Sequence, residues 1–158
     1  LFISKFESTR NSFYLKKFSN NFEKKLYSTF VYFMPLKKIR YSLRNHKDNR
    51  GSFMEFIKTE NNGQFSIFKA KNNQTRGHHF HHTKVEKFLV INGKAKFFMK
   101  DVSSNKKIEY FLDHKDPMVV ETIPGWKHYI KNVGKEELSV LLWSNEVYND
   151  NKPDTYQI

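Results

Sequence analysis

Histidines and one glutamate gather between residues 77 and 93, in the stretch GHHFHHTKVEKFLVING. His79 and His81 are two residues apart, and Glu86 follows five residues after His81. Side chains alternate across a β-strand with a period of two, so His79 and His81 would share one face of a strand. A later segment, PGWKHYIKN, supplies His128. Three imidazoles and one carboxylate suit a borderline divalent transition metal such as zinc.

Other interpretations of the histidine cluster stay open. His78 and His82 have the opposite strand parity, so we expect a surface or supporting role for each, although a shifted register would make them the ligands. The cluster could also be a solvent-facing loop that binds metal adventitiously, but that explains neither Glu86 nor His128. Structural zinc sites are usually closed by four protein ligands, so a purely structural ion is a further alternative.

These two segments are similar to the paired motifs of the cupin superfamily. In that family an HxH pair is followed by a glutamate about four residues on, a glycine further along, and later a proline–glycine turn with a histidine. Glu86 and Gly93 keep that spacing, whereas Pro124 and Gly125 are adjacent where many cupins have one residue between them. The resemblance implies a metal-binding β-barrel, and it implies these metal ligands: His79, His81, Glu86 and His128.

The residues from 48 to 158 are predicted to form one barrel domain of short strands separated by turns. The predicted strands are Phe53–Glu60, Gln64–Lys71, His78–Thr83, Lys87–Ile91, Lys94–Val102, Ile108–Asp113, Met118–Ile123, His128–Asn132 and Leu138–Ser144. Many short strands without helices between them are typical of a closed barrel or a sandwich. With the cupin motifs, the predicted fold class is all-β, a cupin double-stranded β-helix or jelly-roll barrel. The predicted core residues are Phe88, Val90, Phe97, Val119, Ile123, Val140 and Leu142.

Residues 1–47 are predicted to form a short, basic, helical arm. From Asn20 to Met34 apolar residues recur at helical spacing, and Pro35 ends the pattern. Residues 1–19 show no sustained period and are expected to be poorly ordered, and Lys37–Asn49 is predicted to be a polar connector. The apolar face of an amphipathic helix needs a partner, and we favour a neighbouring domain or subunit over a membrane surface.

Charge and composition limit the possible partners. Residues 1–50 hold 12 Lys and Arg against 3 Asp and Glu, whereas the rest of the chain holds 16 against 13. Basic and aromatic residues together could bind single-stranded nucleic acid, but the excess charge lies on the arm and not on the histidine-bearing body, so we expect no nucleic-acid partner. The sequence has no cysteine, no apolar run long enough to span a bilayer and no secretory signal, so we predict a cytoplasmic protein.

A closer resemblance covers roughly Phe22–Tyr156. The runs KLYSTFVYFMP, DNRGSFMEFIKTENNGQFSIFKAK, TRGHHFHHTKVEKFLVINGKAKF, IPGWKHYIKNVG and LLWSNEVYNDNKPDTY resemble the C-terminal cupin domain of the CapF-type bifunctional enzymes of capsular polysaccharide biosynthesis. In that family a reductase domain precedes a zinc cupin. The cupin epimerises C3 of a UDP-linked 4-keto-6-deoxy-N-acetylhexosamine, and the reductase then reduces C4 with NADPH.

This resemblance implies an epimerase rather than a reductase for the present chain. The four metal ligands of the family fall on His79, His81, Glu86 and His128, with zinc or another divalent transition metal as the cofactor. The chain has no glycine-rich dinucleotide fingerprint, so we expect no NADPH site and no reductase activity from this chain alone. The implied partners are a UDP-sugar substrate, a second copy in a homodimer, and a reductase domain or separate reductase protein.

Epimerisation next to a ketone needs a base and an acid near the metal. Three candidates adjoin the predicted ligands in sequence and have suitable chemistry: His82, favoured because a histidine titrates near neutrality, Lys84 and Tyr129. An anionic diphosphate needs cationic partners, and the candidates are Arg76, Lys87 and Lys127, with a merely solvated surface as the alternative for the lysines. Two other functions remain: a 3,5-epimerase or ketoisomerase of a related nucleotide sugar, and a non-catalytic cupin that binds metal or sugar.

Overall fold

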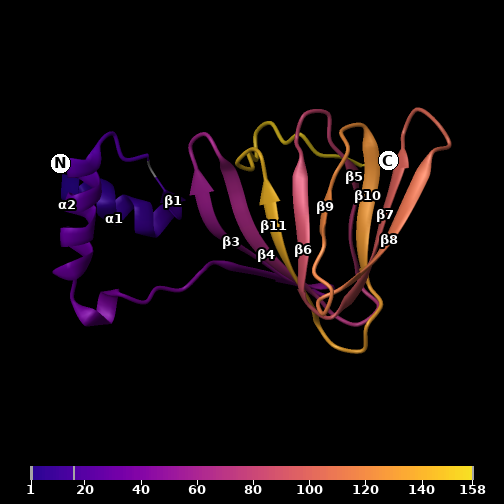
Figure 1. Cartoon of the computed structure of the whole chain (residues 1–158), viewed down its shortest axis with the longest axis horizontal. Helices are drawn as coiled ribbons and strands as arrows, with labels where there is room; N and C mark the ends of the chain where they lie inside the picture. The colour runs from indigo at the N-terminus through magenta and orange to yellow at the C-terminus, as the bar shows by residue number, and fades with distance from the viewer. Residues whose placement is uncertain (1, 16, 158) are drawn as a thin grey trace.

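Two β-sheets face each other in the computed structural model, which describes residues 2–15 and 17–157 (Figure 1). The first sheet has the order β1-β3-β4-β11-β6-β9, with β2 also paired to β3, and the second has the order β12-β5-β10-β7-β8. All neighbouring strands are antiparallel except β1 and β3. This double-sheet jelly roll with short helices at its start confirms the predicted all-β fold class.

The strands of the first sheet are β1 (Tyr14–Leu15), β2 (Asn45–Asp48), β3 (Gly51–Thr59), β4 (Gly63–Ala70), β6 (Glu86–Asn92), β9 (Val119–Glu121) and β11 (Leu138–Ser144). Those of the second sheet are β5 (Thr75–Phe80), β7 (Lys94–Asp101), β8 (Lys107–Asp113), β10 (Trp126–Asn132) and β12 (Tyr156–Gln157). The predicted Asn61-Asn62-Gly63 hairpin joins β3 to β4. Gly63 is required there because its φ is 75° and a Cβ would lie 1.7 Å from the carbonyl oxygen of Ser144.

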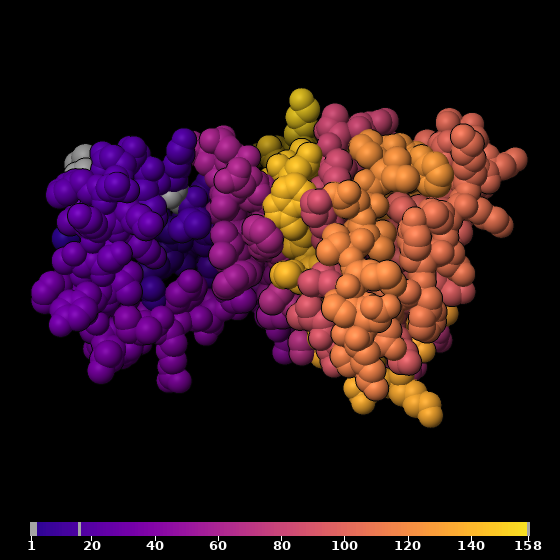
Figure 2. Space-filling model, in the orientation of Figure 1, coloured from indigo at the N-terminus to yellow at the C-terminus, as the bar shows by residue number. Residues whose placement is uncertain are grey.

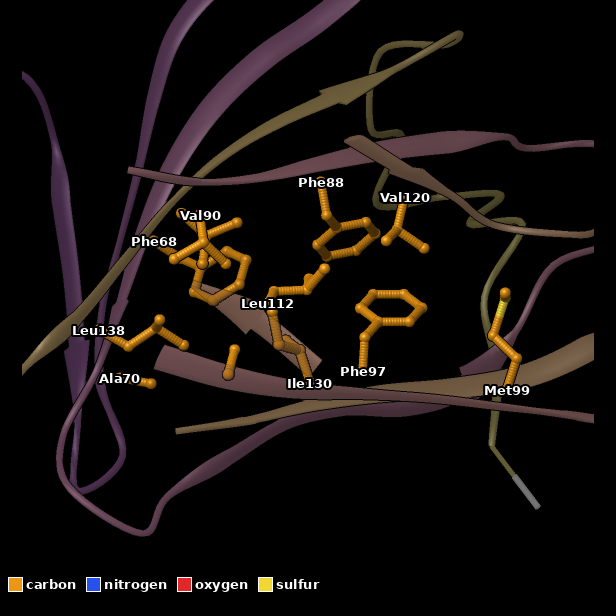
Figure 3. Close-up of a cluster of buried hydrophobic side chains, with 12 residues drawn as sticks. Phe68, Ala70, Phe88, Val90, Phe97, Met99, Leu112, Val120, Ile130 and Leu138 are labelled. Atoms are coloured by element: carbon orange, nitrogen blue, oxygen red, sulfur yellow. The ribbon is translucent and has the colours of Figure 1, made fainter. Parts of the chain in front are cut away.

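The core fills the space between the sheets (Figure 3). Its buried members are Phe68, Ala70, Phe88, Val90, Ala95, Phe97, Met99, Leu112, Val120, Ile130, Leu138 and Val140, with Leu142 packed against them. The predicted core positions Val119 and Ile123 are wrong, because they are 57% and 42% exposed. Their neighbours Val120 and Thr122 face inward instead. A shift of one residue along a strand exchanges its two faces, which accounts for the error.

The arm consists of α1 (Phe2–Ser12), β1, α2 (Asn21–Tyr32) and the 3-10 turn Leu36–Lys38. Helix α2 confirms the helix predicted from Asn20 to Met34. The side chain of Asn20 caps its first turn by accepting a hydrogen bond from the Glu23 N–H at 3.0 Å. Helix α1 and strand β2 were not predicted; β2 lies inside the segment expected to be a polar connector.

Aromatic contacts hold the two helices of the arm together. The Phe6 side chain of α1 is 3% exposed and packs 5.1 Å from the ring of Tyr27 and 5.5 Å from that of Phe30, both on α2. Helix α1 of the same arm therefore covers part of the apolar face of α2, where a neighbouring domain or subunit was expected. The arm forms a lobe beside the β3 edge of the barrel (Figure 2), where β1 pairs with the end of β3. Within the described residues, no helix has the length and apolar character needed to cross a bilayer.

Candidate metal centre

Three strands and the loop after β5 bring four potential ligands together at one end of the barrel. His79 lies on β5 directly opposite His128 on β10, His81 follows the end of β5, and Glu86 begins β6. One potential ligand atom from each of the four lies within 4.8 Å of the others. His81, His128 and Glu86 are 1%, 2% and 7% exposed. The structure thus brings together the whole predicted metal group.

The orientation of the imidazoles fits a cation at the centre of this group. His81 Nδ1 donates a hydrogen bond to the carbonyl oxygen of Asp154 at 2.5 Å, and His128 Nδ1 donates one to that of Trp126 at 3.3 Å. In the neutral rings Nε2 then carries a lone pair, and both Nε2 atoms lie 3.2 Å from Glu86 Oε2. Lone pairs and a carboxylate oxygen that converge in this way repel one another unless a cation lies between them. The four residues therefore fit a divalent transition metal.

The protonation of the group also favours metal binding. Burial, together with the nearby His128, lowers the pKa of His79 to about 3, so this imidazole is neutral at physiological pH. Burial alone would raise the pKa of Glu86, but the neighbouring His128 and His81 outweigh it and hold the pKa well below its ordinary value. Neutral imidazole and ionised carboxylate are the forms that bind metal.

The C-terminal segment, which includes the NKPDTY run, fastens the loop that carries His81. The Asp154 carboxylate accepts hydrogen bonds from the backbone N–H groups of His82, Thr83 and Lys84 at 2.9, 2.8 and 2.7 Å. Burial opposes the ionised form, but these bonds together hold the pKa of Asp154 far below its ordinary value. Strand β12 then pairs with β5 beside His79. The segment supports the metal group from outside, as partners of metal-binding histidines commonly do.

A cavity of about 410 Å³ opens beside the metal group. Both sheets contribute ligands to its wall, with His79 and His128 from the second sheet and Glu86 from the first, and polar side chains of β4 and β11 lie beside Glu86. The lining residues are Arg50, Phe53, Glu55, Gln64, Ser66, Phe68, Arg76, Gly77, His79, Lys84, Glu86, Phe88, His128, Ile130, Leu142, Ser144, Tyr148, Thr155 and Gln157. A larger hollow of about 1010 Å³ lies in the arm and is lined by residues 3–41, so it is separate from the metal group.

Of the six residues predicted to act on the substrate, Lys84 and Arg76 line this cavity. Lys84 is 7% exposed, and its Nζ donates a hydrogen bond to Thr155 Oγ1 at 3.0 Å. The amine also lies 6.0 Å from the centre of the Tyr148 ring, another residue of the cavity wall. Lys84 is therefore a titratable group held in place next to the metal ligands.

The two other predicted acid–base residues lie outside the cavity. The His82 side chain is exposed and packs against the ring of Tyr156 at 4.6 Å. Tyr129 has the opposite parity to the ligand His128 on β10, and its ring stacks on that of His78 at 4.7 Å. The shifted register that would make His78 and His82 the ligands is not the observed one, because neither belongs to the metal group.

The predicted substrate-binding lysines also lie outside the cavity. Lys87 is on the outer face of β6, where it forms an ion pair with Glu121 of the adjacent β9. Lys127 lies on β10 next to the ligand His128 and so points to the opposite side of the strand. Adjacent residues on a strand point to opposite faces, so a lysine next to an inward-facing ligand points outward. The prediction considered only closeness in sequence and not this alternation.

A β-bulge explains why Arg76 and His79 both face the cavity although they are three residues apart. The register between β5 and β10 shifts at this point, with His128 opposite His79 but Tyr129 opposite Gly77. The bulge adds one residue to β5 relative to β10, and the backbone accommodates it at Gly77 and His78, whose φ values are 101° and 70°. Left-handed backbone is uncommon for a residue other than glycine, and bulges of this kind often turn side chains toward functional sites.

Several residues of the cavity wall were not found by sequence reasoning. Arg50, Tyr148 and Thr155 belong to a turn and to the segment after β11, which have no periodic pattern to place them. The NKPDTY run carries part of the resemblance to the family, but no periodic pattern places Asp154 beside residues 82–84. The charged Asp154 next to Pro153 in a polar segment was the one available signal.

Comparison with known proteins identifies the family. The model of the polysaccharide biosynthesis C-terminal domain matches residues 46–156. The chain belongs to this family. A curated relative, the UDP-2-acetamido-2,6-beta-L-arabino-hexul-4-ose reductase of Pseudomonas aeruginosa, is 41% identical over 151 residues, which cover 96% of the present chain and 41% of the reductase.

Solved structures agree with the family assignment and with the fold. The crystal structure of the capsular polysaccharide assembling protein CapF from Staphylococcus aureus has a TM-score of 0.96 and 40% identity, and the match covers 99% of this chain and 42% of CapF. The chain thus spans about two fifths of the length of these relatives. The Drosophila melanogaster CENP-C cupin domain, at 16% identity and a TM-score of 0.56 over 65% of this chain and 75% of its own, shows only that the barrel is a cupin fold.

Proposed function

We propose that this chain is a metal-dependent epimerase that acts at C3 of a UDP-linked 4-keto-6-deoxy-N-acetylhexosamine in the biosynthesis of a surface polysaccharide. The family and the names of the relatives support the modification of a nucleotide sugar for capsular polysaccharide. The observation that carries the proposal is the group of three histidines and one glutamate on the wall of a cavity of about 410 Å³ that also holds a buried lysine. We propose zinc as the metal.

The reaction requires a proton to leave C3 and to return on the other face of the sugar ring. A bound divalent cation supplies electrostatic stabilisation for the negative charge that develops on the ketone oxygen. In this proposal Lys84 removes the proton from one face, because its amine lies in the cavity and Thr155 orients it, and a second group delivers a proton to the other face. Tyr148 lines the same cavity and is the second group that can carry a proton.

Solvent exchange tests the proposal directly. The 4-keto UDP-sugar is incubated with the metal-loaded chain in deuterated buffer, and the position of the label is read by NMR or mass spectrometry. Deuterium at C3 alone is the expected result. Label at C5 as well, or conversion of aldose to ketose, would show a 3,5-epimerase or a ketoisomerase instead, and an unlabelled sugar would show a cupin that binds without catalysis.

Three accompanying predictions concern the setting of the enzyme. The name of the Pseudomonas relative refers to a reductase, and we propose that reduction requires a separate reductase domain or protein and does not occur on this chain alone. Mixing the chain with NADPH and the keto sugar and following absorbance tests this. The homodimer and the cytoplasmic location stay predictions, which sedimentation and cell fractionation can test.

A further inference from the structure

Arg76 lines the cavity, and the hydrogen-bonding capacity of its guanidinium is only partly used. Its side chain is 15% exposed, and its Nη1 atom is fully buried without a hydrogen-bond partner in the part of the chain that the structure describes. Below the guanidinium lies the ring of Phe68, 5.6 Å from Cζ to the ring centre. A guanidinium has five N–H donors, and a buried donor without an acceptor costs free energy. Because Arg76 lines the cavity, an anionic acceptor there would bond the remaining donors of the guanidinium.

A second arginine and one carboxylate complete the charge distribution around Arg76. Asp48 Oδ1 lies 3.5 Å from Arg76 Nη1, within ion-pair range but beyond good hydrogen-bond geometry. Asp48 Oδ2 accepts two bonds from Arg50, at 3.0 Å from Nε and 2.6 Å from Nη2. Arg50 and Arg76 both line the cavity, whereas Asp48 is not among its lining residues. One carboxylate is thus shared by two guanidinium groups, and the cavity side of the trio is positive.

The position of this pair relative to the metal group matches a sugar with a phosphate at its far end. Arg76 lies on β5 opposite Ile130 and three residues before the ligand His79, with the bulge between them. At about 3.3 Å per strand residue, two to three residues correspond to roughly 7 to 10 Å along the strand. That distance suits a hexose ring whose keto side faces the metal group and whose anomeric oxygen carries the first phosphate.

We propose that Arg76 and Arg50 form an anion subsite that binds the diphosphate of a nucleotide-sugar substrate, with Asp48 as their shared counterion. The inference rests on the proposed function and names the residues that would hold the nucleotide side of the substrate. The fork of an arginine matches phosphate oxygens with two parallel hydrogen bonds, and such bonds are strong where solvent is largely excluded. The bulge at Gly77 and His78 is the feature that turns Arg76 to this task.

Calorimetric titration with UDP and with uridine tests the subsite on the metal-loaded chain. Arg76→Gln is expected to weaken UDP binding by roughly 10- to 100-fold and to leave uridine binding unchanged, because the lost bonds are charge-assisted and largely buried. Arg76→Lys, which keeps the charge and lacks the fork, is expected to lose about 3- to 10-fold. Lys87→Ala is the matched control, since it also removes one positive charge but lies on the outer face of β6, and UDP affinity should not change.

Asp48→Asn is expected to strengthen UDP binding, whereas Arg76→Gln is expected to weaken it. In the wild type, Asp48 Oδ1 accepts hydrogen bonds from the backbone N–H groups of Arg50 and Gly51 at 2.9 and 3.1 Å. The oxygen of the asparagine amide can still accept these bonds, but the neutral amide no longer balances the charge of the two guanidinium groups. UDP should then bind about 3-fold more tightly at low salt. If Asp48→Asn leaves or weakens UDP binding, or if Arg76→Gln binds UDP as the wild type does, the subsite is rejected and the diphosphate binds elsewhere, for example at the metal.

The two proposals can fail separately. UDP binding that depends on Arg76, together with no deuterium at C3 in the wild type, keeps the subsite and rejects the epimerase. Deuterium at C3 together with UDP affinity that does not change in Arg76→Gln supports the proposed epimerase activity and rejects the anion subsite. Metal content and circular dichroism of each variant show whether the fold is intact, and Arg76→Lys and Asp48→Asn remain informative if Arg76→Gln does not fold.

Discussion

Replacing Asp154 with Ala removes the carboxylate that fastens the ligand loop to the C-terminal segment. The carboxylate accepts the backbone N–H groups of His82, Thr83 and Lys84 and also the Thr83 hydroxyl. Hydrogen bonds to a charged group contribute about 1.5 to 3 kcal/mol each. His82 and Thr83 are exposed, so in the variant water can bond their N–H groups in place of the carboxylate. The loss of these hydrogen bonds therefore costs much less than their full contribution.

The residual cost comes mainly from Lys84, which is 7% exposed and whose N–H would lose its acceptor. One such unsatisfied group costs about 1 to 3 kcal/mol, so we expect Asp154→Ala to lower the free energy of unfolding by about 2 to 3 kcal/mol in total. For a chain of this size that corresponds to a fall in Tm of about 5 to 10 °C. Because the loop carries His81, zinc affinity should also fall by roughly 10-fold or more.

The assay is thermal unfolding of the metal-free protein by circular dichroism, followed by zinc titration against a competing chelator. Asp150→Ala is the matched control: it removes one negative charge from the same segment, and the Asp150 side chain is exposed. If Asp154→Ala and Asp150→Ala have the same Tm and the same zinc affinity, the carboxylate does not hold the loop and the reasoning is refuted.

Three further predictions concern the cavity and its surroundings. Lys84→Met should slow deuterium exchange at C3 by about 100-fold or more with zinc content unchanged, and Lys87→Met should exchange like the wild type. His81→Ala should lose zinc in elemental analysis whereas His78→Ala keeps it, and equal zinc in both would contradict the ligand assignment. Hydrogen bonds from Arg50 are the main cause that holds the pKa of Asp48 below its ordinary value. The stability that the ionised Asp48 adds is therefore fully present above the unfolded pKa of about 3.9, and it is lost as the pH falls through the lower pKa of the folded protein. The difference in Tm between the wild type and Asp48→Asn should accordingly shrink below about pH 4, and thermal unfolding at several pH values measures it.

Strand periodicity together with the resemblance to the cupin motifs was enough to predict most of the barrel and the metal group. His79 lies on β5 and His81 in the loop directly after it, and they meet Glu86 and His128 as the resemblance implied. The helix from Asn20 was readable because its cap, its apolar spacing and the following Pro35 all agree. In these places several local signals point to the same structure, which is the condition under which a sequence specifies its fold locally.

The parts that could not be predicted depend on contacts that are distant in sequence. Helix α1 has a weak pattern, and its Phe6 is buried only because α2 comes to lie against it. The face of β9 follows from its pairing with β6, which no local pattern reveals. Arg76 enters the cavity through a bulge at a non-glycine residue, and the preference for His82 over Lys84 failed to anticipate that His82 points to solvent.

The pairing of β1 and β2 with β3 has a consequence for any attempt to shorten this protein. The outer side of β3 is covered at one end by Asn45–Asp48 and at the other by Tyr14–Leu15, so the backbone groups of this nine-residue strand are largely shielded from other chains. A version that begins at Gly51 would present that row of donors and acceptors to solvent. An exposed edge strand of this length can pair with the edge strand of another molecule, which leads to aggregation. The strands Tyr14–Leu15 and Asn45–Asp48 therefore protect the protein against this kind of association.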